Sequence, residues 1–104
     1  MTDPYLIAYA PQAVTDLDGI IERIAKRSPQ NGKRVLHRIL ANIDSLKTFP
    51  NRTVVRGRGG SGKAPVRTLP VQSWIIFFRV LEEEKVVRIL RIRHGARRRP
   101  KHFE

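Results

Sequence analysis

The sequence contains no cysteine, one methionine and one tryptophan among its 104 residues. The lack of cysteine excludes disulfide bonds and thiolate metal sites, and it leaves the redox compartment open. No apolar run approaches the ~20 residues that a transmembrane helix needs, so we expect no membrane span. The first residues are MTDPYLIAYAPQAV, which carry neither a basic segment nor a long apolar run. We therefore expect no secretory signal and a cytoplasmic protein.

Acidic residues are also scarce: 9 Asp and Glu stand against 21 Lys and Arg, which leaves a formal net charge of +12. A basic surplus of this size predicts an acidic partner, which can be a nucleic acid, an anionic membrane or an acidic protein. Composition alone does not choose among these three. With 104 residues, 40% of them hydrophobic, the chain is long enough for one core, so we expect a single domain over 1–104.

The strongest local pattern is a predicted β-hairpin over 74–93. Two β-rich runs, 74–81 and 86–93, flank an acidic turn at 82–85. Neither face of this hairpin is plainly polar, so we expect one face to pack on helices and part of the other to await a partner. If Leu81 pairs with Val86, alternation predicts the other partners, which are Val80 with Val87, Phe78 with Ile89, Ile76 with Arg91 and Trp74 with Arg93.

Two amphipathic helices are predicted between 11 and 49. Ser28 is a good N-cap and Pro29 suits a first helical turn, so we expect the second helix to start there and to end before Pro50. Apolar residues recur at helical spacing in both segments, and each stripe needs a surface to pack on. The stripe of the first helix is Val14, Leu17, Ile21 and Ile24, and that of the second is Leu36, Ile39, Leu40, Ile43 and Leu46.

Shorter β-prone runs lie at 5–9 and 66–70, on either side of the two helices. The segment 51–65 is NRTVVRGRGGSGKAP, which we interpret as a Gly-rich basic loop, and a cationic tail occupies 95–104. The predicted order is therefore β-α-α-β-β-β. It indicates an α+β fold in which an N-terminal helical hairpin packs on one face of a largely antiparallel four-stranded sheet.

The Gly-rich loop contains GRGGSGKA, which comes within one residue of a phosphate-binding P-loop, with Gly57, Gly62 and Lys63 in place. Ala64 lacks the hydroxyl that would bind magnesium, and Pro65 leads into a predicted strand rather than a helix. Three scattered histidines with no cysteine do not indicate a metal site. We expect no nucleotide, metal or other small-molecule cofactor.

Four stretches of the chain carry a resemblance to a known family. They are the opening YLIAYAPQAVTDLDGIIERIA, the strand VRTLP, the hairpin IIFFRVLEEEKVVRILRI and the ending RHGARRRP. Together they resemble the ParE/RelE superfamily, the toxins of type II toxin-antitoxin systems, often labelled plasmid-stabilisation proteins. The most specific piece is His94, Gly95, Ala96 and Arg97, which is similar to the ParE branch. The resemblance covers nearly the whole chain except 57–64, and it implies a RelE/ParE-like fold and a small basic toxin neutralised by an antitoxin encoded beside it.

The two branches of this superfamily differ in target. ParE-like members are associated with poisoning DNA gyrase, whereas RelE-like members cut mRNA in the ribosomal A site, which needs proton-transfer groups and cations around the phosphate. If the chain is such a ribonuclease, the catalytic candidates are Arg67, His94 and Arg97. Arg67 replaces a lysine and is a poor base, Ile75 stands where RelE-like sheets carry another arginine, and no tyrosine follows Tyr9. The resemblance thus favours a non-enzymatic gyrase poison, with the endoribonuclease and a non-catalytic nucleic-acid-binding module as alternatives.

Arginines on the predicted strands and in the tail are the candidate binding groups. An arginine on a strand either extends into solvent from the sheet edge or binds a carboxylate or phosphate. The cationic tail is either merely solvated or steers the protein toward nucleic acid. We expect an acidic antitoxin segment to cover the helical hairpin and the exposed sheet face, ordering as it binds. The target-binding candidates are Arg67, Arg91, His94, Arg97, Arg98 and Arg99, and the antitoxin-binding candidates are Arg79, Arg88, Phe77 and Leu90.

Overall fold

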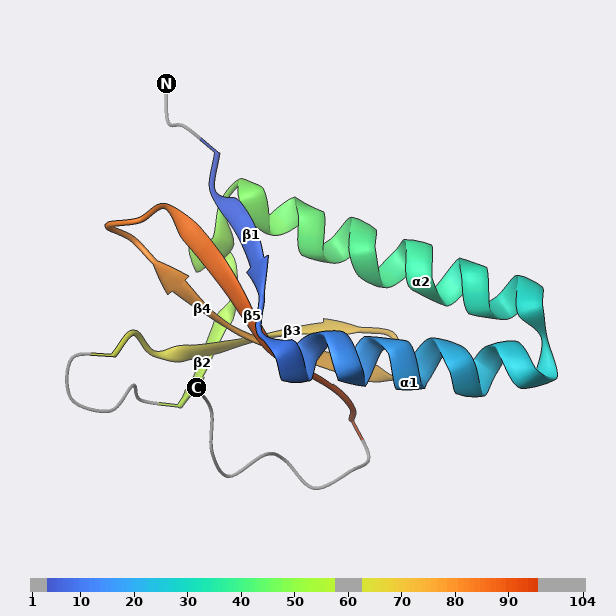
Figure 1. Cartoon of the computed structure of the whole chain (residues 1–104). Helices are drawn as coiled ribbons and strands as arrows, with labels where there is room; N and C mark the ends of the chain where they lie inside the picture. Colours follow the sequence, from blue (N-terminus) through green and yellow to red (C-terminus); the bar gives the residue numbers. More distant parts are fainter. Residues whose placement is uncertain (1–3, 58–62, 96–104) are drawn as a thin grey trace.

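The computed structural model describes residues 4–57 and 63–95, which form two helices packed on one five-stranded sheet (Figure 1). The helices are α1 (Pro11–Arg27) and α2 (Pro29–Asp44), and α2 is followed by the 3-10 turns η1 (Ser45–Lys47) and η2 (Pro50–Arg52). The strands are β1 (Leu6–Tyr9), β2 (Val54–Gly57), β3 (Val66–Val71), β4 (Trp74–Leu81) and β5 (Val86–His94), in the spatial order β1-β5-β4-β3-β2. β1 runs parallel to β5, and every other pair is antiparallel. The predicted α+β fold with its helical hairpin is confirmed.

The sheet has one strand more than predicted, because β2 occupies part of the segment that the sequence predicts as a loop. Val54 and Val55 are β-branched residues that favour a strand, and they pair with Thr68 and Arg67 of β3. The glycines that follow are typical of a loop, so the composition of this segment does not indicate the short strand. β2 is an edge strand, and Val54 and Val55 are 57% and 48% exposed.

The connection between α1 and α2 follows the predicted capping pattern. Ser28 Oγ accepts a hydrogen bond from the backbone N–H of Asn31 at 3.3 Å, and Pro29 is the first residue of α2. Gly32 lets the two helices approach closely, because a Cβ at this position would lie 3.1 Å from the Cβ of Ala25. The two helices are therefore closely packed near their connection, and each presents an apolar stripe to the sheet.

The end of α2 differs from the prediction, because the helix stops at Asp44 rather than near Phe49. The chain tightens into η1 and then reverses at Phe49, whose φ of 54° lies in the left-handed region that side chains with a Cβ disfavour. Arg52 Nη1 holds this turn by donating to the carbonyl oxygens of Ser45, Thr48 and Phe49 at 3.4, 3.1 and 2.9 Å.

The main core lies between the helical hairpin and one face of the sheet. On α1 the predicted stripe is confirmed at Leu17, but Ala13 and Ile20 belong to the core side in place of Val14 and Ile21, and Val14 is 46% exposed. The backbone N–H of Ala10 donates to the carbonyl of Ile89 at 2.8 Å, and this bond to β5 sets how α1 faces the sheet. The predicted stripe of the second helix is confirmed at Ile39 and Ile43 of α2 and at Leu46, which lies in η1, whereas Leu40 is 38% exposed.

A β-bulge changes the predicted register of the β4–β5 hairpin. The pairs nearest the turn match the prediction as far as Phe78 with Ile89, and the register shifts between Phe77 and Phe78. Leu90 is the extra residue on β5, because Phe77 pairs with Arg91. The remaining pairs are Ile76 with Ile92, Ile75 with Arg93 and Trp74 with His94, so the predicted partners of Ile76 and Trp74 are wrong by one residue.

The bulge decides which residues reach the main core. Ile92 turns toward the helices and joins that core, in the place that the sequence assigns to Arg91. Arg91 instead pairs with Phe77, and its side chain reaches α1 at the β5 edge. We call the sheet face turned away from the helices the far face, and its members on the central strands include Val66, Ile75, Phe77, Arg79, Arg88 and Leu90.

Candidate functional site

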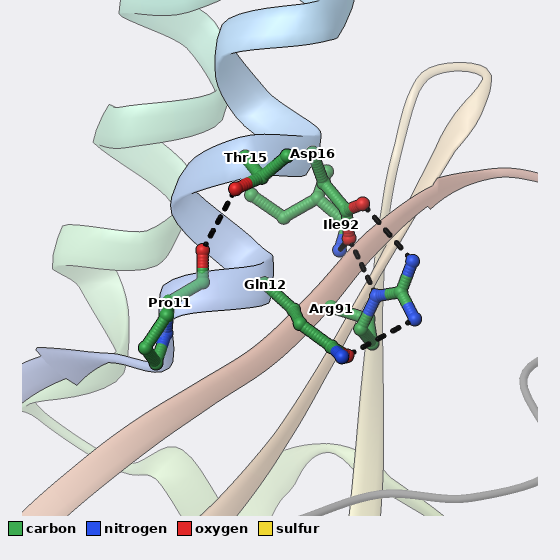
Figure 2. A network of polar contacts seen from close by, with 6 residues as sticks. All are labelled: Pro11, Gln12, Thr15, Asp16, Arg91 and Ile92. Atoms are coloured by element: carbon green, nitrogen blue, oxygen red, sulfur yellow. Dashed lines mark hydrogen bonds and ion pairs between the residues drawn. The ribbon is translucent and has the colours of Figure 1, made fainter.

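Arg91 is bound by α1 at the bulged end of β5. Its Nε and Nη2 donate to the two carboxylate oxygens of Asp16 at 2.8 and 3.1 Å, and its Nη1 donates to Gln12 Oε1 at 3.3 Å (Figure 2). The backbone N–H of Ile92 also donates to Asp16, at 2.9 Å. The hydrogen bonds that Arg91 donates to the Asp16 carboxylate raise the pKa of Arg91. Since β1 pairs only with 86–89, Asp16 occupies the part of the β5 edge that β1 leaves unpaired.

Asp16 is the residue of this network that the sequence analysis misses. It lies three residues after buried Ala13 and four before Ile20, which packs on the core. Residues three and four apart share a helix face, so this spacing places Asp16 toward the sheet. An acidic residue at that position is the signal in the sequence, but its partner lies 75 residues further along the chain.

Arg79 lies on the far face of β4, directly opposite Arg88 of β5. Only 7% of Arg79 is exposed, and its Nε and Nη1 have no hydrogen-bond partner in the part of the chain that the structure describes. Burial lowers the pKa of Arg79. Like charges at opposed positions destabilise a strand pair, and a buried ion without hydrogen bonds is unfavourable. Among the described residues, Arg79 is therefore a buried charge without a compensating partner.

A small apolar cluster adjoins Arg79 on the far face. Val66, Phe77 and Leu90 are 3%, 2% and 2% exposed, and Ile75 packs against them. Phe77 and Leu90 are antitoxin-binding candidates, and neither side chain is at the surface in this conformation. The far face thus combines a compact apolar part with the guanidinium groups of Arg79 and Arg88.

Arg67 points to the opposite side of the sheet from Arg79, because it pairs with Phe78 of the main core. Its Nη1 donates to the carbonyl oxygens of Thr53 at 2.7 Å and Asn51 at 3.3 Å. These two bonds join β3 to the segment that precedes β2. Arg67 therefore has a structural role in addition to its candidate role in target binding.

His94 ends β5 on the helix side of the sheet. Its ring meets that of Trp74 edge-on, with the ring centroids 6.1 Å apart and the planes at 83°. Both residues line a cleft of about 610 Å³ between α1 and the sheet. The other lining residues combine apolar and charged groups, and they are Thr15, Asp16, Gly19, Ile20, Arg23, Ile24, Ile92 and Arg93.

The structure does not bring the described ribonuclease candidates together. Arg67 faces Phe78 from β3, whereas His94 faces Trp74 from β5, so β4 and four residues of its length separate them. Arg97, Arg98 and Arg99 lie outside the described residues. Residues 63–65 lead into β3 and not into a helix, as expected for a chance P-loop likeness.

Within residues 4–57 and 63–95, no group of three or more His, Asp or Glu residues is placed to hold a metal ion. No helix in these two ranges has the length and apolar character needed to cross a membrane.

Solved structures of similar shape come from toxin-antitoxin systems. One is the chromosomal ParDE TA system from P. aeruginosa, with 24% identity and a TM-score of 0.69 over 89% of this chain and 98% of that chain. The archaeal RelE-RelB complex from Pyrococcus horikoshii has 19% identity and a TM-score of 0.65 over 91% and 99% of the two chains. The RelBE2 complex from Mycobacterium tuberculosis has 21% identity and a TM-score of 0.64 over 93% and 98%. These similarities show that the chain has the RelE/ParE toxin fold.

The sequence comparison is more specific than the fold. Residues 7–99 match the family model described as the ParE toxin of type II toxin-antitoxin system, parDE. No curated protein matches the sequence. Because the family match spans most of the chain, the chain belongs to the ParE toxin family of type II toxin-antitoxin systems.

Proposed function

We propose that this chain inhibits DNA gyrase in the cytoplasm and is held inactive by an acidic antitoxin encoded beside it. The observation that carries the proposal is the match to the ParE family model over residues 7–99. A gyrase poison needs no acid–base chemistry of its own, because the damage comes from stabilising the cleaved intermediate of another enzyme.

The positions of three residues support gyrase over mRNA as the target. General acid–base catalysis needs proton-transfer groups within about 3 Å of the reacting atoms. Arg67 donates to two backbone carbonyls, and β4 lies between it and His94, so the two are not set to act on one phosphate. Ile75 stands at the position of another RelE-like arginine and packs into the far-face cluster.

The proposed gyrase-binding surface centres on exposed His94 and the cationic tail with Arg97, Arg98 and Arg99. Arg67 and Arg91 remain candidates, but their hydrogen bonds to Thr53 and Asp16 favour a role in shaping the sheet that carries this surface. Positive charge near the end of β5 would attract a DNA-bound enzyme, with a rate of association that falls as salt rises.

The antitoxin proposal rests on charge and on exposed apolar groups. The structures from P. horikoshii and M. tuberculosis are toxin-antitoxin complexes, and a chain with a net charge of +12 attracts an acidic segment. Leu6 on β1, Val14 on α1 and Leu40 on α2 are 69%, 46% and 38% exposed. We propose that the antitoxin covers these apolar groups on β1 and the helical hairpin and reaches the far face near Arg79 and Arg88.

Two assays on the purified chain separate the possible targets. We expect inhibition of gyrase supercoiling with accumulation of cleaved DNA, and no new mRNA ends in an in-vitro translation assay read by primer extension. New mRNA ends without an effect on gyrase would assign the endoribonuclease instead. If neither assay responds and expression without antitoxin is harmless, a non-catalytic nucleic-acid-binding module is favoured.

A matched pair of variants tests the proposed gyrase-binding surface. Arg98→Ala with Arg99→Ala removes two charges from the tail, and Lys33→Ala with Arg34→Ala removes two exposed charges from α2. We expect the tail variant to weaken gyrase inhibition about tenfold through lost electrostatic attraction. Equal weakening by both variants would show that only net charge matters and would contradict a tail-centred surface.

A further inference from the structure

Arg79 is the one charged residue among the described residues that is buried, at 7% exposure. Its Nε and Nη1 have no hydrogen-bond partner within residues 4–57 and 63–95. The residue opposite it on β5 is another arginine, Arg88, so the neighbouring strand supplies no anion. The far face therefore holds a dehydrated positive charge whose donors point at no acceptor that the structure describes.

Such an arrangement is unfavourable for the isolated chain. A guanidinium that leaves water loses its hydration, and the loss is recovered only if an anion or hydrogen-bond acceptors replace the water. Replacing a buried ion by an apolar residue of similar volume is often stabilising. A buried arginine with two unused donors is thus explained by an acceptor that arrives from outside the described residues.

The surroundings of Arg79 favour a carboxylate on a polypeptide over a nucleic-acid phosphate. A guanidinium binds a carboxylate through two parallel hydrogen bonds. Beside it lie Val66, Phe77 and Leu90, which are at most 3% exposed. A nucleic-acid backbone brings a row of hydrated charges, which this apolar cluster does not match. An extended peptide that alternates acidic and apolar side chains brings one carboxylate to Arg79 without placing further charges over this buried apolar cluster.

We propose that Arg79 is the receptor for one Asp or Glu carboxylate of the antitoxin, and that the free toxin is destabilised until this carboxylate binds. The inference rests on the proposed antitoxin partner, and it adds the residue and the chemical group that meet. Under this proposal, both antitoxin binding and toxin stability depend on the guanidinium of Arg79. The unfavourable charge on the free toxin is relieved only by an acidic side chain of the antitoxin, which makes binding selective for that side chain.

The central test compares Arg79→Met with wild-type toxin in two measurements. The full chain is co-expressed with the acidic protein encoded in the adjacent reading frame, separated from it in denaturant and refolded. We expect R79M to raise the urea midpoint of the free toxin and to raise the dissociation constant of the complex, measured by calorimetry, at least about tenfold. Arg79→Lys keeps the charge but loses the two-bond geometry, so we expect intermediate affinity. A merely structural arginine would lower stability and affinity together, which would overturn the proposal.

A double-mutant cycle identifies the carboxylate. Each Asp and Glu of the adjacent-frame protein is changed to Asn or Gln and titrated against wild-type and R79M toxin. We expect one change to weaken binding to wild-type about tenfold and to leave binding to R79M unaltered. If R79M does not refold, the same cycle is run against R79K. Independent effects at every acidic position would overturn the proposal.

Four further outcomes distinguish this inference from the proposed function. Failure of wild-type toxin to bind the adjacent-frame protein would contradict the antitoxin proposal and this inference together. Equal affinity of wild-type and R79M would overturn this inference alone. A stability difference between wild-type and R79M that disappears when Glu104→Gln is added would place the carboxylate in the toxin itself. Weaker binding of R79M to duplex DNA but not to the antitoxin would indicate a phosphate, and both of these results overturn the proposal.

Discussion

Arg91 and Arg79 lie on neighbouring strands of one sheet and have opposite surroundings. Arg91 donates to both oxygens of Asp16 and to Gln12, whereas Arg79 is more deeply buried and has two donors without a described partner. The difference follows from strand order, because α1 runs along the β5 edge while β4 lies between β3 and β5. A guanidinium whose partners lie within the chain stabilises the fold. The absence of such partners among the described residues is the basis for the proposal that Arg79 binds a carboxylate of the antitoxin.

The largest expected effect comes from Asp16→Ala. This change leaves the guanidinium of Arg91 and the backbone N–H of Ile92 without their acceptor in a site that is only partly exposed. We expect the free energy of unfolding to fall by about 3 kcal/mol, measured by urea denaturation. Asp16→Asn keeps one acceptor oxygen and should lower the free energy of unfolding by a smaller amount. An effect below about 1 kcal/mol, typical of a surface ion pair, would remove the contrast between the two arginines.

Changing each arginine to methionine tests the comparison directly. Arg91→Met removes the cation from a satisfied pair and should lower the free energy of unfolding by about 2 kcal/mol. Arg79→Met removes an uncompensated cation and should raise the same quantity by about 1 kcal/mol. Urea denaturation of the two free proteins under identical conditions gives both values. If both substitutions shift stability in the same direction, the distinction between a structural and a partner-binding arginine is wrong.

The smallest expected effect belongs to Glu82, a carboxylate that is satisfied but exposed. It accepts hydrogen bonds from Tyr5 Oη at 2.6 Å and Asn51 Nδ2 at 2.7 Å, and these bonds lower its pKa. A depressed pKa in the folded state stabilises the protein above the ordinary value of 4.5, and this contribution is lost as the pH falls through the folded-state pKa. We expect Glu82→Gln to lower the free energy of unfolding by less than about 1 kcal/mol at neutral pH.

Urea denaturation of wild-type and E82Q at neutral and acidic pH measures this contribution. The difference between the two proteins should vanish in acid, where Glu82 is protonated in both the folded and unfolded chains. Glu83→Gln in the same turn is the matched control and should leave the free energy of unfolding at neutral pH unchanged. If E82Q lowered the free energy of unfolding at neutral pH as much as D16A does, the difference in burial between the Glu82 and Asp16 networks would not explain their contributions to stability.

Local patterns predicted the features that depend on near neighbours in the chain. Ser28 and Pro29 mark the start of α2 because capping is decided within one helical turn. The hairpin pairs are correct up to Phe78 with Ile89, since the turn sets the register closest to it. Alternation also placed Arg79 and Arg88 on one face, as the structure has them.

Features set by distant packing were not predictable in the same way. Leu90 and Ile92 are both apolar, so the choice of which one faces the main core depends on the space under the helices and not on the local pattern. The binding of Arg91 by Asp16 joins residues 75 positions apart, and no spacing within either element specifies it. β2 is short and followed by glycines, and its strand becomes evident only from its pairing with β3.

The pairing of β1 with β5 also sets the order in which this protein completes its fold. Leu6 to Tyr9 are made early, and in the described sheet their hydrogen-bonding neighbour is β5, near the other end of the chain. During synthesis the first strand must therefore wait for the last hairpin, and contacts of such long sequence separation form late. A ribosome that stalls before residue 86 would release a chain with neither its edge strand anchored nor its far face assembled. The five-stranded sheet, and with it any surface that a neutralising partner covers, would then be complete only after β5 has been synthesised.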